Sequence, residues 1–208
     1  MSARVRILSA VRAGALGERP HPGRFRPGPA HASWDALAAA VAGSGAEALG
    51  PFERQEGGTE AHELGSGVAA QVGDWGGGRT IASPDAARLL GPGPWETVSL
   101  DADPASLADV SIGIVSGAVA VAENGAVGIP AALAPQRALL FLCERLILLV
   151  DAGNIASQMH IATEAVEGSL AADAHFSWIA GPSKTADIPG TVVVGAHGPR
   201  EVVVVGFR

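Results

Sequence analysis

The spacing of apolar and polar positions separates an irregular first part of this chain from a regular second part. Apolar residues recur at helical spacing over residues 3–16 and again over residues 33–48, which predicts two helices. Between them, residues 17–32 contain four prolines and predict a linker without regular structure. Residues 50–78 are rich in glycine and acids and predict at most one weak helix, over residues 59–72.

From residue 79 onward, short apolar runs alternate with helical patterns. Helices are predicted over residues 85–90 and 154–170. Strands are predicted over residues 80–82, 96–100, 110–115, 118–122, 138–142, 146–150, 175–180, 191–194 and 202–207. Many of these runs are continuous in Val, Ile and Leu instead of alternating with polar residues, which is typical of strands buried on both faces.

The connections between neighbouring runs indicate how the sheet is arranged. Within 110–122 and within 138–150, two apolar runs follow each other too closely for a parallel crossover, so part of the sheet is expected to be antiparallel. We therefore predict an α/β fold with three layers, α/β/α, and a mixed sheet. Residues 33–208 would form this single domain, preceded by an N-terminal helix and a Pro/Arg-rich linker over residues 1–32.

The charge distribution limits which partners the chain can bind. Residues 1–30 carry six Arg and one acid, which leaves 8 of the 14 basic and 20 of the 21 acidic residues, a net charge of −12, for the remainder. Nucleic-acid binding is not expected, because phosphates require a coherent basic surface. The basic arm at 1–30 would either contact an acidic partner or be a solvated helix end and linker.

The cysteine, histidine and apolar content limits the cofactors and the compartment. Cys143 is the only cysteine, so this chain alone cannot hold an iron–sulfur cluster, which needs about four ligands that are mostly thiolates. The histidines are dispersed, and Glu60, His62 and Glu63 fall in a polar loop, so no metal site is predicted. No apolar run reaches the ~18–20 residues of a membrane helix, and Arg12 interrupts what would be the apolar part of a signal peptide. We expect a cytoplasmic protein without membrane insertion.

The segment 181–201 contains Lys184, the only lysine, and is the first candidate for a ligand site. Gly181 begins a turn after a predicted strand, where exposed backbone N–H groups and an ammonium can hold an anion. Its other candidate ligand-binding residues are Ser183, Thr185 and Asp187. Alternatively, Thr185 and Asp187 cap a helix or hold the turn in place. The glycines of a Walker A loop are missing at the required positions.

Two further turns carry candidate chemistry. His197 is expected in a tight hairpin turn between the strands at 191–194 and 202–205. It would either lie at a strand end where small ligands bind in α/β sheets, or form a hydrogen bond to the backbone of its own turn. Nearby, Arg200 would bind a carboxylate or pair with a neighbouring acid. Glu123 follows an apolar strand. Its carboxylate would act as a base or a nucleophile, or it would be part of an ordinary polar turn between two strands.

The turn after Glu123 belongs to the same candidate site. Asn124 and Gly125 allow a positive φ there, and both are candidate ligand-binding residues.

These motifs together resemble one protein family. GPSKTADI followed by VVVGAHGPRE resembles the C-terminal signature of the lactate-utilisation protein C family, the LUD-domain proteins. VSIGIVSGAVAVAENGAV is similar to that family's strand, turn and strand ending in Glu, and RALLFLCERLILLVDAGNI also fits. The resemblance covers residues 79–208 well and residues 33–78 weakly. Asn124 and Ala126 stand where the family more often has Ser or Thr.

The resemblance implies a fold like that of sugar-phosphate (NagB and ribose-phosphate) isomerases and coenzyme A transferases. It also implies a role in oxidising L-lactate to pyruvate together with iron–sulfur oxidoreductase subunits, which would carry the clusters. We therefore hypothesise a subunit that binds a small carboxylate or other anionic ligand through Lys184 and its neighbours. In this hypothesis, Glu123 and His197 are the catalytic residues that transfer protons.

Two alternatives remain open from the sequence. A Glu-Asn-Gly turn after a buried strand is similar to the catalytic glutamate motif of coenzyme A transferases, so Glu123 would form a thioester in an acyl or coenzyme A transferase or a related ligase. In the other alternative, the chain is a non-catalytic assembly or regulatory subunit that docks through residues 1–30. Whether it catalyses any reaction by itself is left open.

Overall fold

The computed structural model describes residues 2–14, 32–53, 63–99, 102–168, 175–188 and 191–208. The helices are α1 (Ala3–Ala13), α2 (Trp34–Ser44), α3 (Glu63–Asp74), α4 (Pro84–Leu90), α5 (Leu139–Leu142) and α6 (Met159–Ala165), with a 3₁₀ turn η1 (Pro104–Leu107). The strands are β1 (Glu47–Phe52), β2 (Thr80–Ala82), β3 (Glu96–Thr97), β4 (Ile112–Ser116), β5 (Val119–Val121), β6 (Val127–Pro130), β7 (Arg145–Asp151), β8 (Ile155–Ala156), β9 (Phe176–Ile179), β10 (Lys184–Ile188), β11 (Thr191–Val194) and β12 (Glu201–Phe207).

A six-stranded parallel sheet forms the centre of the molecule, in the order β1-β12-β7-β4-β2-β3. Its central strands are buried on both faces, as their continuous apolar runs predict. α3 and α4 cover one face, where Ile114 and Ile147 pack beneath them. The other face, which carries Leu148 and Val204, is covered by α2, α5 and a second sheet. The predicted α/β class is confirmed, and the central sheet is parallel and flanked by helices.

The second sheet has four strands in the order β8-β5-β6-β9. Its β5–β6 and β6–β9 pairs are antiparallel, and α6 packs against it through Ala162 and Val166. The chain leaves the central sheet after β4 at Gly117, where an added Cβ would lie 2.3 Å from a methyl carbon of Val127. The antiparallel pairing predicted within 110–122 and within 138–150 is wrong, because β4 and β5 lie in different sheets and residues 139–142 are helical. The antiparallel pairs are β5–β6 and β6–β9 of the second sheet, and every described pair of the central sheet is parallel.

Several predicted elements are corrected by long-range packing. The run 138–142 is not a strand but contains the short helix α5, because only Leu139 and Leu140 point into the core while Phe141 and Leu142 remain half exposed. The helix predicted over 154–170 is shorter, since β8 precedes α6.

The predicted hairpin between 191–194 and 202–205 is also wrong. β11 pairs with β10 in a separate two-stranded sheet, and β12 enters the central sheet between β1 and β7. The helix predicted over 33–48 ends at Ser44, because Gly45 adopts a left-handed conformation (φ 87°) there and the chain continues into β1. β1 itself was not predicted.

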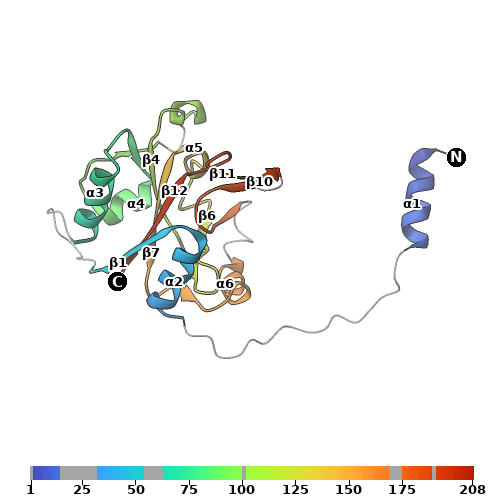
Figure 1. Ribbon diagram of the computed structural model, residues 1–208, viewed down its shortest axis with the longest axis horizontal. Coiled ribbons are helices and arrows are strands. Elements are labelled where there is room, and N and C mark those ends of the chain that lie inside the picture. The colour runs from blue at the N-terminus through green and yellow to red at the C-terminus, as the bar shows by residue number, and fades with distance from the viewer. Residues whose placement is uncertain (1, 15–31, 54–62, 100–101, 169–174, 189–190) are drawn as a thin grey trace.

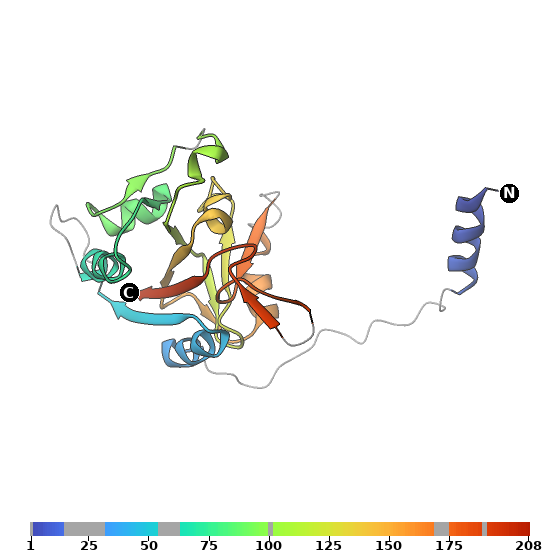
Figure 2. The same ribbon diagram turned by 45° about the horizontal axis from the view of Figure 1, so that its top comes forward.

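α1 stands apart from the other described elements (Figures 1 and 2), and none of its residues is buried. The helix predicted over 3–16 ends at Ala13, and most of the predicted linker lies outside the described residues. The division into residues 1–32 and 33–208 stays a prediction. Within the described part of the chain, no helix has the length and apolar character needed to cross a membrane.

Candidate functional site

Lys184 and His197 lie on one cavity of about 300 Å³, between the start of β10 and the loop before β12. It is lined by Leu140, Phe141, Trp178, Ile179, Ala180, Gly181, Pro182, Ser183, Lys184, His197, Gly198 and Pro199. Backbone bonds hold the two segments together, because Ser183 N donates to Pro199 O (2.9 Å) and Gly195 N donates to Ser183 O (2.9 Å). An ammonium, a hydroxyl and an imidazole therefore share one opening.

The ammonium of Lys184 contacts the end of α2. Its Nζ donates to Ser44 O at 2.7 Å, although the two residues are 140 positions apart in the sequence. Gly181 approaches the same residue, because a Cβ added to it would lie 2.7 Å from Ser44 O. The predicted turn at Gly181 is present with φ 72°. Thr185 is half-buried and pairs with Val193 in the hairpin, whereas the side chain of Asp187 lies outside the described residues.

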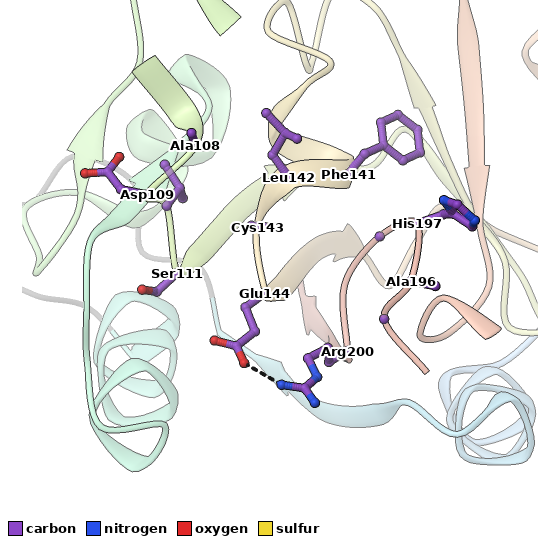
Figure 3. A pocket seen from close by; sticks show the side chains of 13 residues that line it. Ala108, Asp109, Ser111, Phe141, Leu142, Cys143, Glu144, Ala196, His197 and Arg200 are labelled. Carbon is purple, nitrogen blue, oxygen red and sulfur yellow. Dashed lines mark hydrogen bonds and ion pairs between the residues drawn. The ribbon is translucent and has the colours of Figure 1, made fainter. Parts of the chain in front are cut away.

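His197 also lines a larger cavity of about 640 Å³ (Figure 3). The lining residues are Ala108, Asp109, Val110, Ser111, Phe141, Leu142, Cys143, Glu144, Gly195, Ala196, His197, Gly198 and Arg200. Ser111, Glu144 and Arg200 each come directly before a strand of the central sheet, so this cavity opens at the amino ends of β4, β7 and β12. The sequence placed His197 by analogy with sites at strand carboxyl ends, and the structure places it at the opposite edge.

Arg200 is paired with an acid, the second of the two roles considered for it. Its guanidinium and the Glu144 carboxylate point toward one another in Figure 3, with Nη1 3.1 Å from Oε1. On the next residues along the two strands the charges are reversed, with Arg145 Nε 3.0 Å from Glu201 Oε1. The sequences Glu-Arg and Arg-Glu at the starts of β7 and β12 thus place opposite charges side by side in the observed register.

Glu123 and Asn124 support backbone elsewhere, at the turn between β5 and β6. The Glu123 carboxylate accepts a bond from Met159 N (2.9 Å) at the start of α6. Asn124 Oδ1 accepts from Ala126 N (3.0 Å), as in an ordinary Asx turn. Gly125 has φ 72°, and a Cβ added to it would lie 2.8 Å from the backbone N of Val41 in α2.

The structure therefore brings some of the proposed site residues together and leaves others apart. Lys184, Ser183, Gly181 and His197 meet at one cavity, and neither cavity that His197 lines includes Glu123. Gly125 and Lys184 both approach α2, at Val41 and Ser44 respectively, so α2 is the element shared by the two motifs.

Other residues of the site were not identified from the sequence. Phe141 lines both cavities and is half exposed, but its run was interpreted as a strand. Ser44 and Gly45 were placed inside a longer helix, although a glycine after the last helical turn is a recognisable end signal. Trp178 gave no signal beyond an apolar position in a predicted strand.

Cys143 is one of the residues that line the larger cavity, and its thiol is buried. Its side chain is 2% exposed, and burial raises the pKa of the thiol to about 12. Among the described residues, no three His, Cys, Asp or Glu side chains are grouped as a metal would require. Glu60 and His62, considered above, lie outside those residues.

Comparison with known proteins finds a family match over part of the chain and a shared fold. Residues 103–205 match the LUD domain family. Lactate utilization protein C of Deinococcus radiodurans is 34% identical over 125 residues, which cover 55% of this chain and 59% of that protein. This chain therefore matches less than two thirds of that relative's length. The crystal structure of a DUF162 family protein from Deinococcus radiodurans aligns with TM-score 0.62 and 19% identity, over 84% of this chain and 95% of that chain, which shows a shared fold.

Proposed function

We propose that the protein works in lactate utilisation, because its residues 103–205 match the LUD domain family. In this proposal it is a subunit that binds L-lactate, or a closely related small carboxylate, while the substrate is oxidised to pyruvate. The similarity to a relative named lactate utilization protein C supports the choice of substrate. Lactate has six non-hydrogen atoms, so a cavity of about 300 Å³ has room for it.

The observation that carries the proposal is the shared position of Lys184 and His197 on that cavity. An ammonium binds a carboxylate by a charge-assisted hydrogen bond, which is stronger than a bond between neutral groups. An imidazole on the same cavity is suited to accept the proton of the substrate hydroxyl, because histidine is the side chain most often used as a general base. In this assignment, Lys184 holds the carboxylate and His197 takes the O–H proton as the alcohol becomes a ketone.

The reaction also breaks the Cα–H bond, so two electrons and a second proton must leave the substrate. We propose that iron–sulfur clusters of a partner subunit accept the two electrons and that the Cα proton is released to water. The chain has one cysteine, and its buried thiol stays protonated at neutral pH because burial raises its pKa to about 12.

α1 supports a contact with such a partner, since it exposes Val5, Ile7, Leu8 and Val11 by 42–64% and carries three arginines without an acid. Replacing Ile7 and Val11 by Asp should abolish co-purification with the partner without unfolding the protein, and unchanged co-purification would argue against α1.

Growth on L-lactate tests the assignment of Lys184. In a strain without its own copy of the gene, the Lys184→Ala variant should fail to support growth while its protein level stays normal. Arg208→Ala is the matched control, because Arg208 is an exposed cation at the other end of β12, paired with Glu53. With purified protein, Lys184→Ala should weaken L-lactate binding ~10-fold or more, as expected for a lost hydrogen bond to a charged group. Equal growth of Lys184→Ala and wild type would remove Lys184 from the function.

A further inference from the structure

The position of the Lys184 ammonium depends on the absence of a side chain at Gly45. A Cβ built on Gly45 would lie 2.6 Å from Lys184 Nζ and 3.5 Å from its Cε, closer to the ammonium than any real Cβ stands. Gly45 is also the residue that ends α2, with φ 87°. The same glycine therefore ends the helix and leaves the space that the ammonium occupies.

In the last turn of α2, the carbonyl that binds this ammonium is that of Ser44. Gly45 N donates to Ala42 O (3.0 Å) and Ala46 N donates to Val41 O (3.2 Å), as in a common glycine-ended helix. Ser44 O instead accepts from Lys184 Nζ (2.7 Å). The final carbonyls of a helix lack partners within it and carry a partial negative charge, so a cation is favoured at this position.

Ser44 is held from its other side as well. Its hydroxyl donates to Val41 O at 2.7 Å. A Cβ added to Gly181 would lie 2.7 Å from both Ser44 O and Ser44 Oγ, so Gly181 packs directly on this residue. The acceptor of the ammonium is thus fixed by the helix on one side and by the β9–β10 connection on the other.

We propose that Ser44 O and the backbone of Gly45, at the end of α2, form a binding position for the Lys184 ammonium, here called the seat. Gly45 is the positioning residue, because the absence of a side chain there leaves the seat open. The seat presents the ammonium to the 300 Å³ cavity in one orientation, where it binds the ligand's anionic group. An ammonium has three N–H donors, so the bond to Ser44 O leaves two for that anion. This inference rests on the proposed function for the identity of the ligand, but the seat itself is independent of it.

The seat also explains why a lysine stands at this position in an arginine-rich chain. The other 13 of the 14 Lys and Arg residues are arginines. A guanidinium is a wide planar group, whereas an ammonium is compact enough to fit between Ser44 O and the bare backbone of Gly45. Lys184→Arg keeps the charge and the backbone but should not fit the seat.

The single lysine allows a direct test in the full-length protein. With lysine labelled by ¹³C at Cε, the NMR spectrum reports on one carbon, Lys184 Cε, and on the two Hε protons bound to it. In the wild type we expect two separate Hε shifts, because the ammonium is held in one environment. In Gly45→Ala these should merge at the averaged shift of a freely rotating side chain. An averaged signal already present in the wild type would overturn the seat.

Gly76→Ala is the matched control for Gly45→Ala. Gly76 has a similar φ, 81°, but nothing lies within 4 Å of an added Cβ. Both variants therefore place an alanine at a positive φ, and only Gly45→Ala meets the ammonium. The Hε signals of Gly76→Ala should match the wild type, and merged signals in both variants would show that strain alone is responsible. If Gly45→Ala does not fold, growth and binding of Lys184→Arg test the same seat with the backbone unchanged.

Titration with L-lactate separates this inference from the proposed function. L-lactate should shift the lysine signal of the wild type and of Gly76→Ala, with binding ~10-fold or more weaker in Gly45→Ala and Lys184→Arg. Equal affinity in wild type and Gly45→Ala would overturn the positioning role. Separate Hε shifts in the wild type without any response to L-lactate, pyruvate or inorganic phosphate would refute the proposed function and leave the seat intact.

Discussion

Glu123 offers the clearest test of whether a residue in a catalytic-looking motif is chemical or structural. The residue before α6, Gln158, makes no side-chain bond to the helix, and the Glu123 carboxylate accepts the N–H of Met159 instead. We predict that Glu123→Ala destabilises the protein by removing this acceptor. Glu123→Gln should cost less than half as much, because an amide oxygen accepts the same bond although it can neither act as a base nor form a thioester.

The size of the effect follows from the kind of bond that is lost. Removing a capping acceptor at a helix start costs about 1 kcal/mol. For a chain of this size, that loss lowers the melting temperature by about 2–4 °C. α6 is held mainly by packing of Ala162 and Val166 on the second sheet, so the rest of the fold should survive the substitution.

The measurement combines thermal unfolding with growth on L-lactate. Glu167→Ala, which removes an exposed carboxylate just after α6, is the control and should change the unfolding free energy by less than about 0.5 kcal/mol. Glu123→Gln should grow like the wild type. If Glu123→Gln stops growth at an unchanged melting temperature, the carboxylate has a chemical role and the capping interpretation is insufficient. If Glu123→Ala melts like the wild type, the carboxylate does not cap α6.

Two further predictions concern Cys143 and the charges at the amino ends of β7 and β12. Burial raises the pKa of Cys143 from 9.0 to about 12, so the thiol's contribution to stability is complete below pH 9 and is lost as pH rises toward 12, by ~1.4 kcal/mol per unit. Urea unfolding of wild type and Cys143→Ser between pH 8 and 11 measures this, and parallel pH profiles would contradict it. The exposed pair Glu144–Arg200 should contribute no more than about 1 kcal/mol, so Glu144→Arg and Arg200→Glu each destabilise slightly and the double variant recovers the loss. A double variant with the summed loss of both single variants would show that the pair contributes nothing.

The fold class could be predicted from the sequence because the core strands carry their own signal. The run Val202–Val205 is apolar without interruption, and a strand of that kind must be covered on both faces. The strand partners could not be predicted in this way. β12 pairs with β1 and β7, not with the adjacent β11, and no local pattern indicates a neighbour so distant in sequence.

The site was predictable where its residues lie in one segment. Lys184 and His197 come from the same stretch, and the structure places both on one cavity. Ser44 and Phe141 contact that region only through the packing of α2 and α5, which is set by the whole fold. Glu123 has a contact that the sequence did not predict, because Met159 N, 36 residues later in the chain, donates to its carboxylate. Its catalytic role stays a prediction.

The place of β12 between β1 and β7 has a consequence for how this protein is made. During translation, β1 emerges early, but the strand it pairs with is residues 201–207. Until that segment has left the ribosome, β1 and β7 lack the strand that pairs with both of them. The nascent chain then exposes unpaired strand edges, which promote aggregation.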